Sequence, residues 1–366
     1  METKKKQRSG KLTWGLALGL PLILTALFLV LRGNKALMER WVMGVMAPVE
    51  QFLGRLWSWA PFSAAEVLTA LFLLGSAAWL IRAAVLAVRR RDGRGLLRRL
   101  LAFAAALLWL WAALNWMWNA GYYARSFQER SGLETQPYSV EKLEQVTALF
   151  AQRAAEFSTQ VQRDENGLFA EEREDIFARG VSVYQEIVRE FPCLELEPSV
   201  RAKPLVCSRL QSILGFTGVY FPFTGEANVN VDAPACLLPA TIAHEMAHQR
   251  MVAREQEANF VGIAAAVTST DPVYQYSGYL MGLIQLCNAL APVDREGWNA
   301  IVQQYFTPEL AADWNDNNAY WAQMSSPVED AAEQVYDSFL KGNGQELGIR
   351  SYGACVDLLV AYFGGQ

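Results

Sequence analysis

The chain has 366 residues, long enough for one large domain with a membrane anchor or for two modest domains. Apolar residues make up 52% and charged residues only 19%, which is rich in apolar residues for a soluble protein. Residues 1–119 hold 16 of the 32 Lys and Arg but only 5 of the 37 Asp and Glu. The remaining residues are acidic, so the part expected to be soluble has no basic stripe for nucleic acid and we expect no nucleic-acid partner.

Three apolar stretches predict three transmembrane helices, over about 12–31, 67–88 and 100–120. About twenty residues at 1.5 Å each cross a hydrocarbon core of about 30 Å. The first stretch and the basic residues before it could instead be a signal peptide, but no clear small-residue cleavage site follows. Residues 1–120 are therefore expected to form a membrane anchor in the lipid bilayer, and residues 121–366 a soluble domain.

The connector between the second and third stretches predicts the orientation of the anchor. It is rich in arginine, and the far end of the third stretch is rich in Trp and Tyr, as is typical of a membrane–water interface. By the positive-inside rule the connector and the basic N-terminus are cytoplasmic. We therefore expect a multi-pass protein of the cell membrane with an extracytoplasmic domain. Residues 35–62 would rest in the outer interface or pack against the anchor. The arginines are Arg89, Arg90, Arg91, Arg94, Arg98 and Arg99.

The soluble part is predicted to be mainly α-helical, with a small β-hairpin. An alternating pattern over 218–231, interrupted at Thr224-Gly225, predicts the hairpin. Its second arm, Ala227–Val231, is polar enough to be an edge strand. Another helix should begin at Pro239 and end near Arg250. Apolar residues at helical spacing predict further helices over 139–161, 176–191, 254–267, 274–290, 327–341 and 352–363.

The five cysteines show no CxxC pairing, which argues against a cysteine metal site. One or two disulfides and a set of buried thiols are both compatible with their spacing. They are Cys193, Cys207, Cys236, Cys287 and Cys355.

The two histidines of the chain, His244 and His248, lie four residues apart in the sequence HExxH. This spacing puts both imidazoles on one face of a helix, about one turn apart, where they can bind one ion. Glu245 is rotated by about 100° from His244 and can reach a water at that ion. Zinc lowers the pKa of such a water toward about 7, and Glu245 would accept its proton. The pattern predicts a catalytic Zn²⁺ site, with two core-packing histidines as the plain alternative.

A catalytic zinc ion needs a third protein ligand, and no histidine remains to supply it. Glu255 is the first candidate, because a helix break near Met251 would bring the first turn of the next helix back against the metal. Glu257 is the rival ligand. A solvated acidic turn at the start of a helix is the alternative for both.

The run Glu255-Gln256-Glu257-Ala258-Asn259 resembles the ExxA[ND] form of the third-ligand helix in gluzincin-type peptidases. The resemblance implies that Glu255 is a ligand and that Asn259 hydrogen-bonds a ligand histidine, more weakly than the commoner Asp. With its predicted three-helix anchor and the segments FPFTGEANVN and LPATIAHEMAHQRMVAREQEANF, the whole chain resembles an uncharacterised bacterial family, domain of unknown function 3810. Its members are regarded as membrane-bound zinc peptidases. This implies a zincin-like, gluzincin-like α+β core and no known substrate.

Two further sites are expected around the metal. As an edge strand, the second arm of the hairpin could pair with an extended peptide through Ala227, Asn228, Val229 and Asn230. Tyr352, beside Arg350, is a candidate oxyanion stabiliser, and packing is the alternative for its ring.

Together these patterns predict a membrane-anchored zinc metallopeptidase, a hydrolase that cuts peptide bonds in peptide or protein substrates of the cell envelope. One alternative is a non-catalytic, zinc-containing membrane sensor or scaffold that binds peptides. The intact Glu245 argues against it, because such a protein has no need of a general base. Another alternative is a zinc hydrolase of a non-peptide envelope amide.

Overall fold

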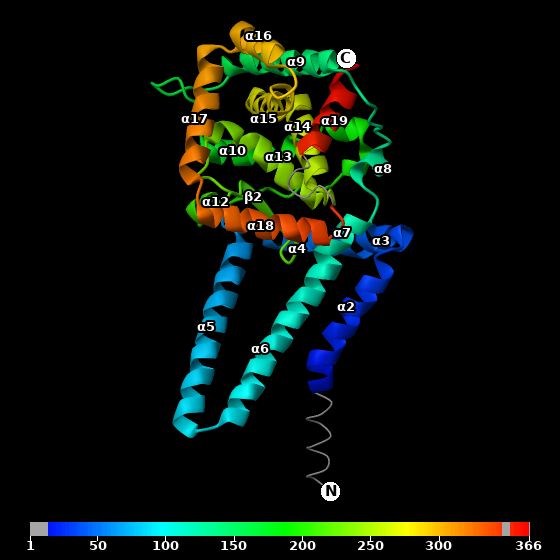
Figure 1. The fold of residues 1–366 in the computed structure, drawn as a ribbon, viewed down its shortest axis with the longest axis vertical. Helices are drawn as coiled ribbons and strands as arrows, with labels where there is room; N and C mark the ends of the chain where they lie inside the picture. Colours follow the sequence, from blue (N-terminus) through cyan, green and yellow to red (C-terminus); the bar gives the residue numbers. More distant parts are fainter. Residues whose placement is uncertain (1–13, 346–351, 366) are drawn as a thin grey trace.

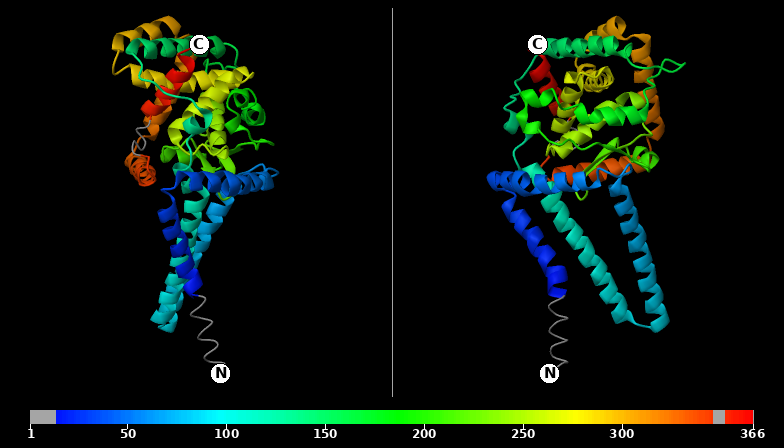
Figure 2. Two further views of the ribbon diagram at one scale, coloured as in Figure 1. Left: turned by 90° about the vertical axis from the view of Figure 1, so that its right-hand side faces the viewer. Right: turned by 180° about the vertical axis from the view of Figure 1, so that it is seen from behind.

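The computed structural model describes residues 14–345 and 352–365. It consists of a mainly helical domain, a layer of short helices across the foot of that domain, and three apolar helices, α2, α5 and α6, that leave the foot on the same side (Figure 1). The two further views in Figure 2 show the same arrangement. The predicted mainly α fold with a small sheet is confirmed.

Two helices in the described residues are long and apolar enough to cross a membrane, Ala64–Arg90 and Gly93–Tyr123. Only 6% and 17% of their most apolar stretches is buried, unlike the core helices of a soluble protein. They form a hairpin that turns at Arg91, where φ is +47°. The elements of this part are η1 (Gly15–Gly19), α2 (Leu20–Leu31), α3 (Lys35–Trp41), η2 (Val42–Met46), α4 (Ala47–Trp57), α5 (Ala64–Arg90), α6 (Gly93–Leu114), η3 (Asn115–Asn119) and α7 (Ala120–Tyr123).

The prediction of three spans is corrected to two. The predicted first span, 12–31, begins at residues that lie outside the described part of the structure. The basic N-terminus also lies outside it. Its described portion, Gly15–Leu31, is a shorter apolar helix. Its 17 residues extend about 25 Å, less than a hydrocarbon core of about 30 Å. This helix packs beside α6 and η3, where the Trp116 Nε1–H donates to the Leu24 carbonyl at 3.1 Å.

The helical domain is built around three central helices, α13, α14 and α15, which pack against one another and against α9 and α19. Gly262 of α14 allows the close contact with α13, since a Cβ there would lie 2.7 Å from the backbone nitrogen of His244. The helices are α8 (Phe127–Ser131), α9 (Val140–Ser158), α10 (Arg173–Arg179), η4 (Gly180–Ser182), α11 (Ile187–Glu190), η5 (Pro192–Leu194), α12 (Ser208–Ile213), η6 (Ala235–Leu237), α13 (Leu238–Gln249), α14 (Glu255–Thr268), α15 (Pro272–Leu290), α16 (Arg295–Tyr305), α17 (Pro308–Met324), α18 (Pro327–Gly342) and α19 (Tyr352–Phe363).

The predicted helix over 176–191 is wrong as a single element. It is divided into α10, the 3₁₀ turn η4 that follows it directly, and α11, which begins after a turn at residues 183–186. The apolar residues that suggested one amphipathic helix are buried by tertiary contacts instead. Tyr184, for example, donates its hydroxyl hydrogen to the Ala243 carbonyl of α13 at 2.7 Å.

The sheet has three strands in the order β1-β3-β2: β1 (Lys203–Pro204), β2 (Gly218–Phe221) and β3 (Glu226–Val229). β2 and β3 are antiparallel and pair Gly218 with Val229, so the predicted hairpin is confirmed. β1 runs parallel to β3 on its other side.

The prediction that Ala227–Asn230 forms an exposed edge is wrong, because β3 is the central strand and its residues are buried. Ala227 and Val229 lie in the core. The Asn228 side chain donates to the Val219 carbonyl and the Asn230 side chain donates to the Phe216 carbonyl. These four residues are therefore not available to pair with a peptide, and the strand at the edge is β2.

The sheet is tied to the foot of the domain by a buried ion pair. Lys203 Nζ lies 2.5 Å from Glu226 Oε1. The Glu226 carboxylate also accepts hydrogen bonds from the backbone N–H groups of Ala64 and Ala65 at 3.2 and 2.8 Å. These two residues open α5, so the carboxylate satisfies free N–H groups at the start of a candidate span.

Candidate metal centre

Helix α13 places the two histidines side by side. Pro239 lies in its first turn, where proline is favoured, and the helix continues without interruption to Gln249. The ring centroids of His244 and His248 are 4.9 Å apart. The predicted break is confirmed at Met251, whose φ of +59° ends the helix and reverses the chain.

The reversal brings Glu255, the first residue of α14, back against both imidazoles. Its Oε2 lies 3.4 Å from His244 Nε2 and 3.8 Å from His248 Nε2. One ligand atom from each residue lies within 4.8 Å of the others. Ligand atoms around a tetrahedral zinc ion are separated by about 3.3 Å, since each lies about 2.0–2.1 Å from the metal. The spacing and the donor set of two imidazoles and one carboxylate therefore fit a zinc ion.

Glu257, the rival ligand, points elsewhere. Its buried carboxylate accepts hydrogen bonds from the backbone N–H groups of Phe127 and Gln128 at 2.8 and 3.3 Å. These groups belong to the first turn of α8, where free N–H groups attract a carboxylate. Glu257 thus anchors a neighbouring helix, and Glu255 alone joins the histidines.

The expected hydrogen bond from Asn259 to a ligand histidine does not form, so that prediction is wrong. His248 Nδ1 lies 2.7 Å from the Val252 carbonyl. Among the described residues, His244 Nδ1 has no hydrogen-bond partner. Because a carbonyl can only accept, His248 carries a hydrogen on Nδ1, and its Nε2, directed at Glu255, is the nitrogen that would bind a metal after losing its proton.

The charges of these three side chains depend on one another. Burial alone would raise the pKa of Glu255, but the two imidazoles hold it well below its usual range. Burial alone would lower the pKa of His248, but the Glu255 carboxylate raises it to about 9. A metal ion binding here would have to displace the proton from His248 Nε2.

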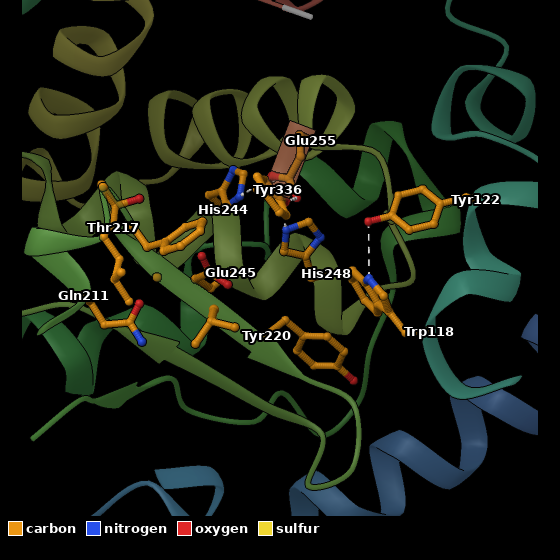
Figure 3. A pocket seen from close by; sticks show the side chains of 15 residues that line it. Trp118, Tyr122, Gln211, Thr217, Tyr220, His244, Glu245, His248, Glu255 and Tyr336 are labelled. Carbon is orange, nitrogen blue, oxygen red and sulfur yellow. Dashed lines mark hydrogen bonds and ion pairs between the residues drawn. The ribbon is translucent and has the colours of Figure 1, made fainter. Parts of the chain in front are cut away.

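Glu245 lies beside this cluster and faces the pocket (Figure 3). Burial raises its pKa to about 7. Within residues 14–345 and 352–365, its Oε2 has no hydrogen-bond partner. Strand β2 passes so close that a Cβ at Gly218 would lie 2.4 Å from Glu245 Oε1. The carboxylate is thus confined between α13 and β2 at the wall of the pocket, and its Oε2 is buried without a partner among the described residues.

The pocket has a volume of about 470 Å³ and is assembled from distant parts of the chain (Figure 3). Its walls come from the end of the α6–η3–α7 helix, the α12–β2 connection, strand β2, helix α13, the start of α14, and α18. The lining residues are Trp118, Tyr122, Gln211, Leu214, Gly215, Phe216, Thr217, Gly218, Val219, Tyr220, His244, Glu245, His248, Glu255 and Tyr336.

Several of these side chains were not identified from the sequence as part of the site. The Tyr336 hydroxyl donates to Glu255 Oε1 at 2.6 Å, and burial raises the pKa of Tyr336, so the hydroxyl keeps its hydrogen. The Trp118 ring meets the His248 ring edge to face at 5.4 Å. Trp118 was identified only as part of an interfacial belt, and the pattern of α18 gave no signal that Tyr336 would face a metal ligand.

Tyr352, the expected oxyanion stabiliser, is the first residue of α19, and its side chain lies outside the described part of the structure, as does Arg350. Helix α19 packs against α14, α15 and α9. All five cysteines are free thiols.

The fold and site define a mainly helical protein that carries a candidate metal centre at the foot of its domain, next to two apolar helices. The chain belongs to the family described as protein of unknown function, DUF3810, whose profile matches residues 41–360. No curated protein and no solved structure matches the chain. Membership of this family, expected from the sequence, is confirmed.

Proposed function

We propose that this protein is a membrane-anchored zinc metallopeptidase. His244, His248 and Glu255 would hold the zinc ion, and Glu245 would act as the general base. The observation that carries the proposal is the convergence of two imidazoles and a carboxylate, with ligand atoms within 4.8 Å of one another, next to Glu245 in an open pocket. In a zinc site of this kind three protein ligands leave one position for water or substrate.

When bound, zinc would supply Lewis acidity, polarising a carbonyl and making water more acidic. The remaining steps fall to the side chains. Glu245 has a pKa of about 7, so near neutral pH it can accept a proton from the attacking water and return it to the leaving amine. Tyr336 holds Oε1 of Glu255, and the two histidines lie near Oε2 of the same carboxylate. Such outer partners commonly govern both the affinity and the orientation of metal ligands.

Strand β2 is the candidate for binding an extended peptide. It is an edge strand, and Gly218, Val219 and Tyr220 line the pocket beside Glu245. A peptide that adds to a sheet edge gains main-chain hydrogen bonds regardless of its side chains. This would present a scissile carbonyl next to the candidate metal site, and it transfers to β2 the role that sequence reasoning gave to β3.

The proposal places the catalytic domain outside the cytoplasm. Helices α5 and α6 would cross the membrane as a hairpin, and their connecting turn lies at the end remote from the soluble domain (Figure 1). That turn carries the six arginines between residues 89 and 99. By the positive-inside rule the turn stays in the cytoplasm and the domain lies on the other side. Substrates would then be peptides or proteins of the cell envelope.

The first test compares the full-length protein with its Glu245→Gln variant, using zinc and quenched fluorescent peptide libraries. Glu165→Gln, an exposed position in the turn after α9, is the matched control. We expect Glu245→Gln to lower the hydrolysis rate at least about 10²-fold, the low end of general-base effects, while zinc content is unchanged. Hydrolysis that is unaffected by Glu245→Gln would refute the mechanism. Peptide binding without hydrolysis by the parent would favour the sensor instead.

The second test measures bound zinc. We expect His244→Ala and Glu255→Ala to lose the metal. Glu257→Gln should retain it, because this side chain caps α8 and lies outside the cluster. Full zinc retention by Glu255→Ala would contradict the proposed ligand set.

A further inference from the structure

A single continuous helix, Gly93–Tyr123, runs from a candidate membrane span into the pocket. Its apolar part begins after Arg98 and Arg99, and twenty residues beyond them reach Asn119. Because about twenty residues cross the hydrocarbon core, Trp118 would lie at the outer boundary of the membrane. The same Trp118 ring contacts His248, so the candidate metal site lies next to that boundary.

Helix α4 gives an independent indication of where the outer membrane boundary lies. It lies across the foot of the domain, where the apolar helices leave (Figures 1 and 2). Val49, Phe52 and Leu56 recur at helical spacing and are 44%, 60% and 50% exposed, and Trp59, just after the helix, is 71% exposed. An exposed apolar stripe of this kind, a few residues before the candidate span α5, fits the headgroup region of a lipid bilayer.

The opposite face of α4 supports the pocket. Glu50 is buried, and its Oε2 accepts a hydrogen bond from the Tyr220 hydroxyl at 2.7 Å. Gly54 packs on the hairpin turn, where a Cβ would lie 2.7 Å from the Gly225 carbonyl oxygen. The Tyr220 ring centroid is 6.4 Å from that of His248. Only one tyrosine side chain therefore separates the candidate metal centre from the helix that carries the apolar stripe.

We propose that the substrates are other membrane-embedded proteins, cut in the segment that immediately follows their exit from the bilayer. The inference rests on the proposed peptidase function and names its substrate class. Three to five extended residues span about 10–15 Å at about 3.3 Å each, enough to pass the Tyr220 side chain that separates the metal centre from α4. Allowing for a curved path, the cut bond lies within about ten residues of the substrate's membrane segment.

The membrane level of α4 is tested without relying on activity. The photoreactive residue p-benzoylphenylalanine replaces Phe52 in one protein and Val293 in another, both in full-length chains in vesicles of phosphatidylethanolamine and phosphatidylglycerol. Val293 is 61% exposed and lies in the connection between α15 and α16, at the end of the domain away from the apolar helices (Figure 1). We expect lipid adducts, detected by mass spectrometry, at position 52 at least tenfold more often than at 293. Equal yields at the two positions would overturn the inference.

The substrate class is tested in the same vesicles with single-span reporter proteins. Each carries a randomised ten-residue segment that starts either 2 or 22 residues beyond its membrane span, and the same segments are also supplied as soluble peptides. New N-termini are counted for the parent and for Glu245→Gln. We expect Glu245-dependent cuts at least tenfold more often in the near segment.

The possible failures are distinguishable. Equal cutting of near and far segments would overturn this inference and leave the peptidase proposal standing. Absence of Glu245-dependent cutting in reporters and soluble peptides alike would overturn the peptidase proposal and this inference with it.

Discussion

The Gly218→Ala substitution tests whether β2 holds Glu245 in its working position. A Cβ at residue 218 would lie 2.4 Å from Glu245 Oε1 and 2.7 Å from both Cγ and Cδ. The strand cannot easily retreat, because it is paired with β3 from Gly218 to Phe221. The Glu245 carboxylate must therefore move.

The size of that movement follows from the contact distance. An ordinary contact between a carbon and an oxygen atom is about 3.4 Å or longer, so relief of the overlap requires a shift of about 1 Å. A displacement of about 1 Å in a catalytic group costs on the order of 10²-fold in rate. We expect Gly218→Ala to lower kcat/KM for peptide hydrolysis by about that factor. Zinc content should be unchanged, because the three atoms nearest to the new methyl group all belong to Glu245, which is not a proposed ligand.

The assay measures kcat/KM and bound zinc for the parent, for Gly218→Ala and for a control, Gly342→Ala. Gly342 ends α18, and a Cβ there would meet no atom within 4 Å. The control should therefore match the parent. If Gly218→Ala keeps its activity within about threefold, confinement of Glu245 by β2 is not needed for the reaction and the reasoning fails.

Four further predictions concern the candidate metal site and the contact between the sheet and helix α5. Tyr336→Phe removes the hydrogen bond to Glu255 and should weaken zinc binding about 10- to 100-fold in chelator competition; unchanged affinity would contradict the role given to this hydroxyl. Zinc affinity should rise about tenfold per pH unit up to pH 9 and then level off, because the His248 proton, with a pKa of about 9, competes with the metal. The raised pKa of His248 also affects the metal-free protein. Its contribution to the free energy of unfolding is fully present below about pH 6.5 and is lost as the pH rises through 9. Urea titrations of the metal-free protein at several pH values would measure this loss. Lys203→Met leaves the buried Glu226 without its cation and should lower the free energy of unfolding by about 3–5 kcal/mol. Adding Glu226→Gln should restore part of this stability. A loss below about 1 kcal/mol would refute this account.

Local spacing was enough to predict the centre of the site. His244 and His248 share a helix face because four residues make about one turn, whatever surrounds them. The break at Met251 also followed from local reasoning, and it brought Glu255 within 3.4 Å of His244. These features involve a dozen consecutive residues, so the folding of the rest of the chain has little influence on them.

The choice between Glu255 and Glu257 could not be made from local sequence with the same force. Both lie in the first turn of α14, and either carboxylate is compatible with a helix N-terminus. In the structure the position of α8 decides between the two residues, because the first N–H groups of α8 donate hydrogen bonds to Glu257. Phe127 is 130 residues away in the sequence, and no periodicity within α14 carries information about it.

The prediction that β3 is an edge strand was wrong for a similar reason. β1 is only two residues long, Lys203-Pro204, and has no alternating pattern that would mark it as a strand. Without it β3 has one partner and is an edge strand. With it β3 becomes the central strand, and the free edge passes to β2. A buried Lys203 is held there by Glu226, and burial of a lysine is seldom evident from sequence alone.

The two histidines, equivalent in the sequence motif, are held in different ways. His248 is fixed on one ring nitrogen by the Val252 carbonyl and on its face by Trp118, a residue of the apolar helix. In the described residues His244 has no partner on Nδ1, and its ring lies against Glu255 and the His248 ring. The chain reversal at Met251 supplies both the third carboxylate and the carbonyl that fixes His248. The apolar helix Gly93–Tyr123 supplies the ring that packs beside His248, so the more firmly held of the two proposed histidine ligands depends on a candidate membrane span as well as on α13 and α14.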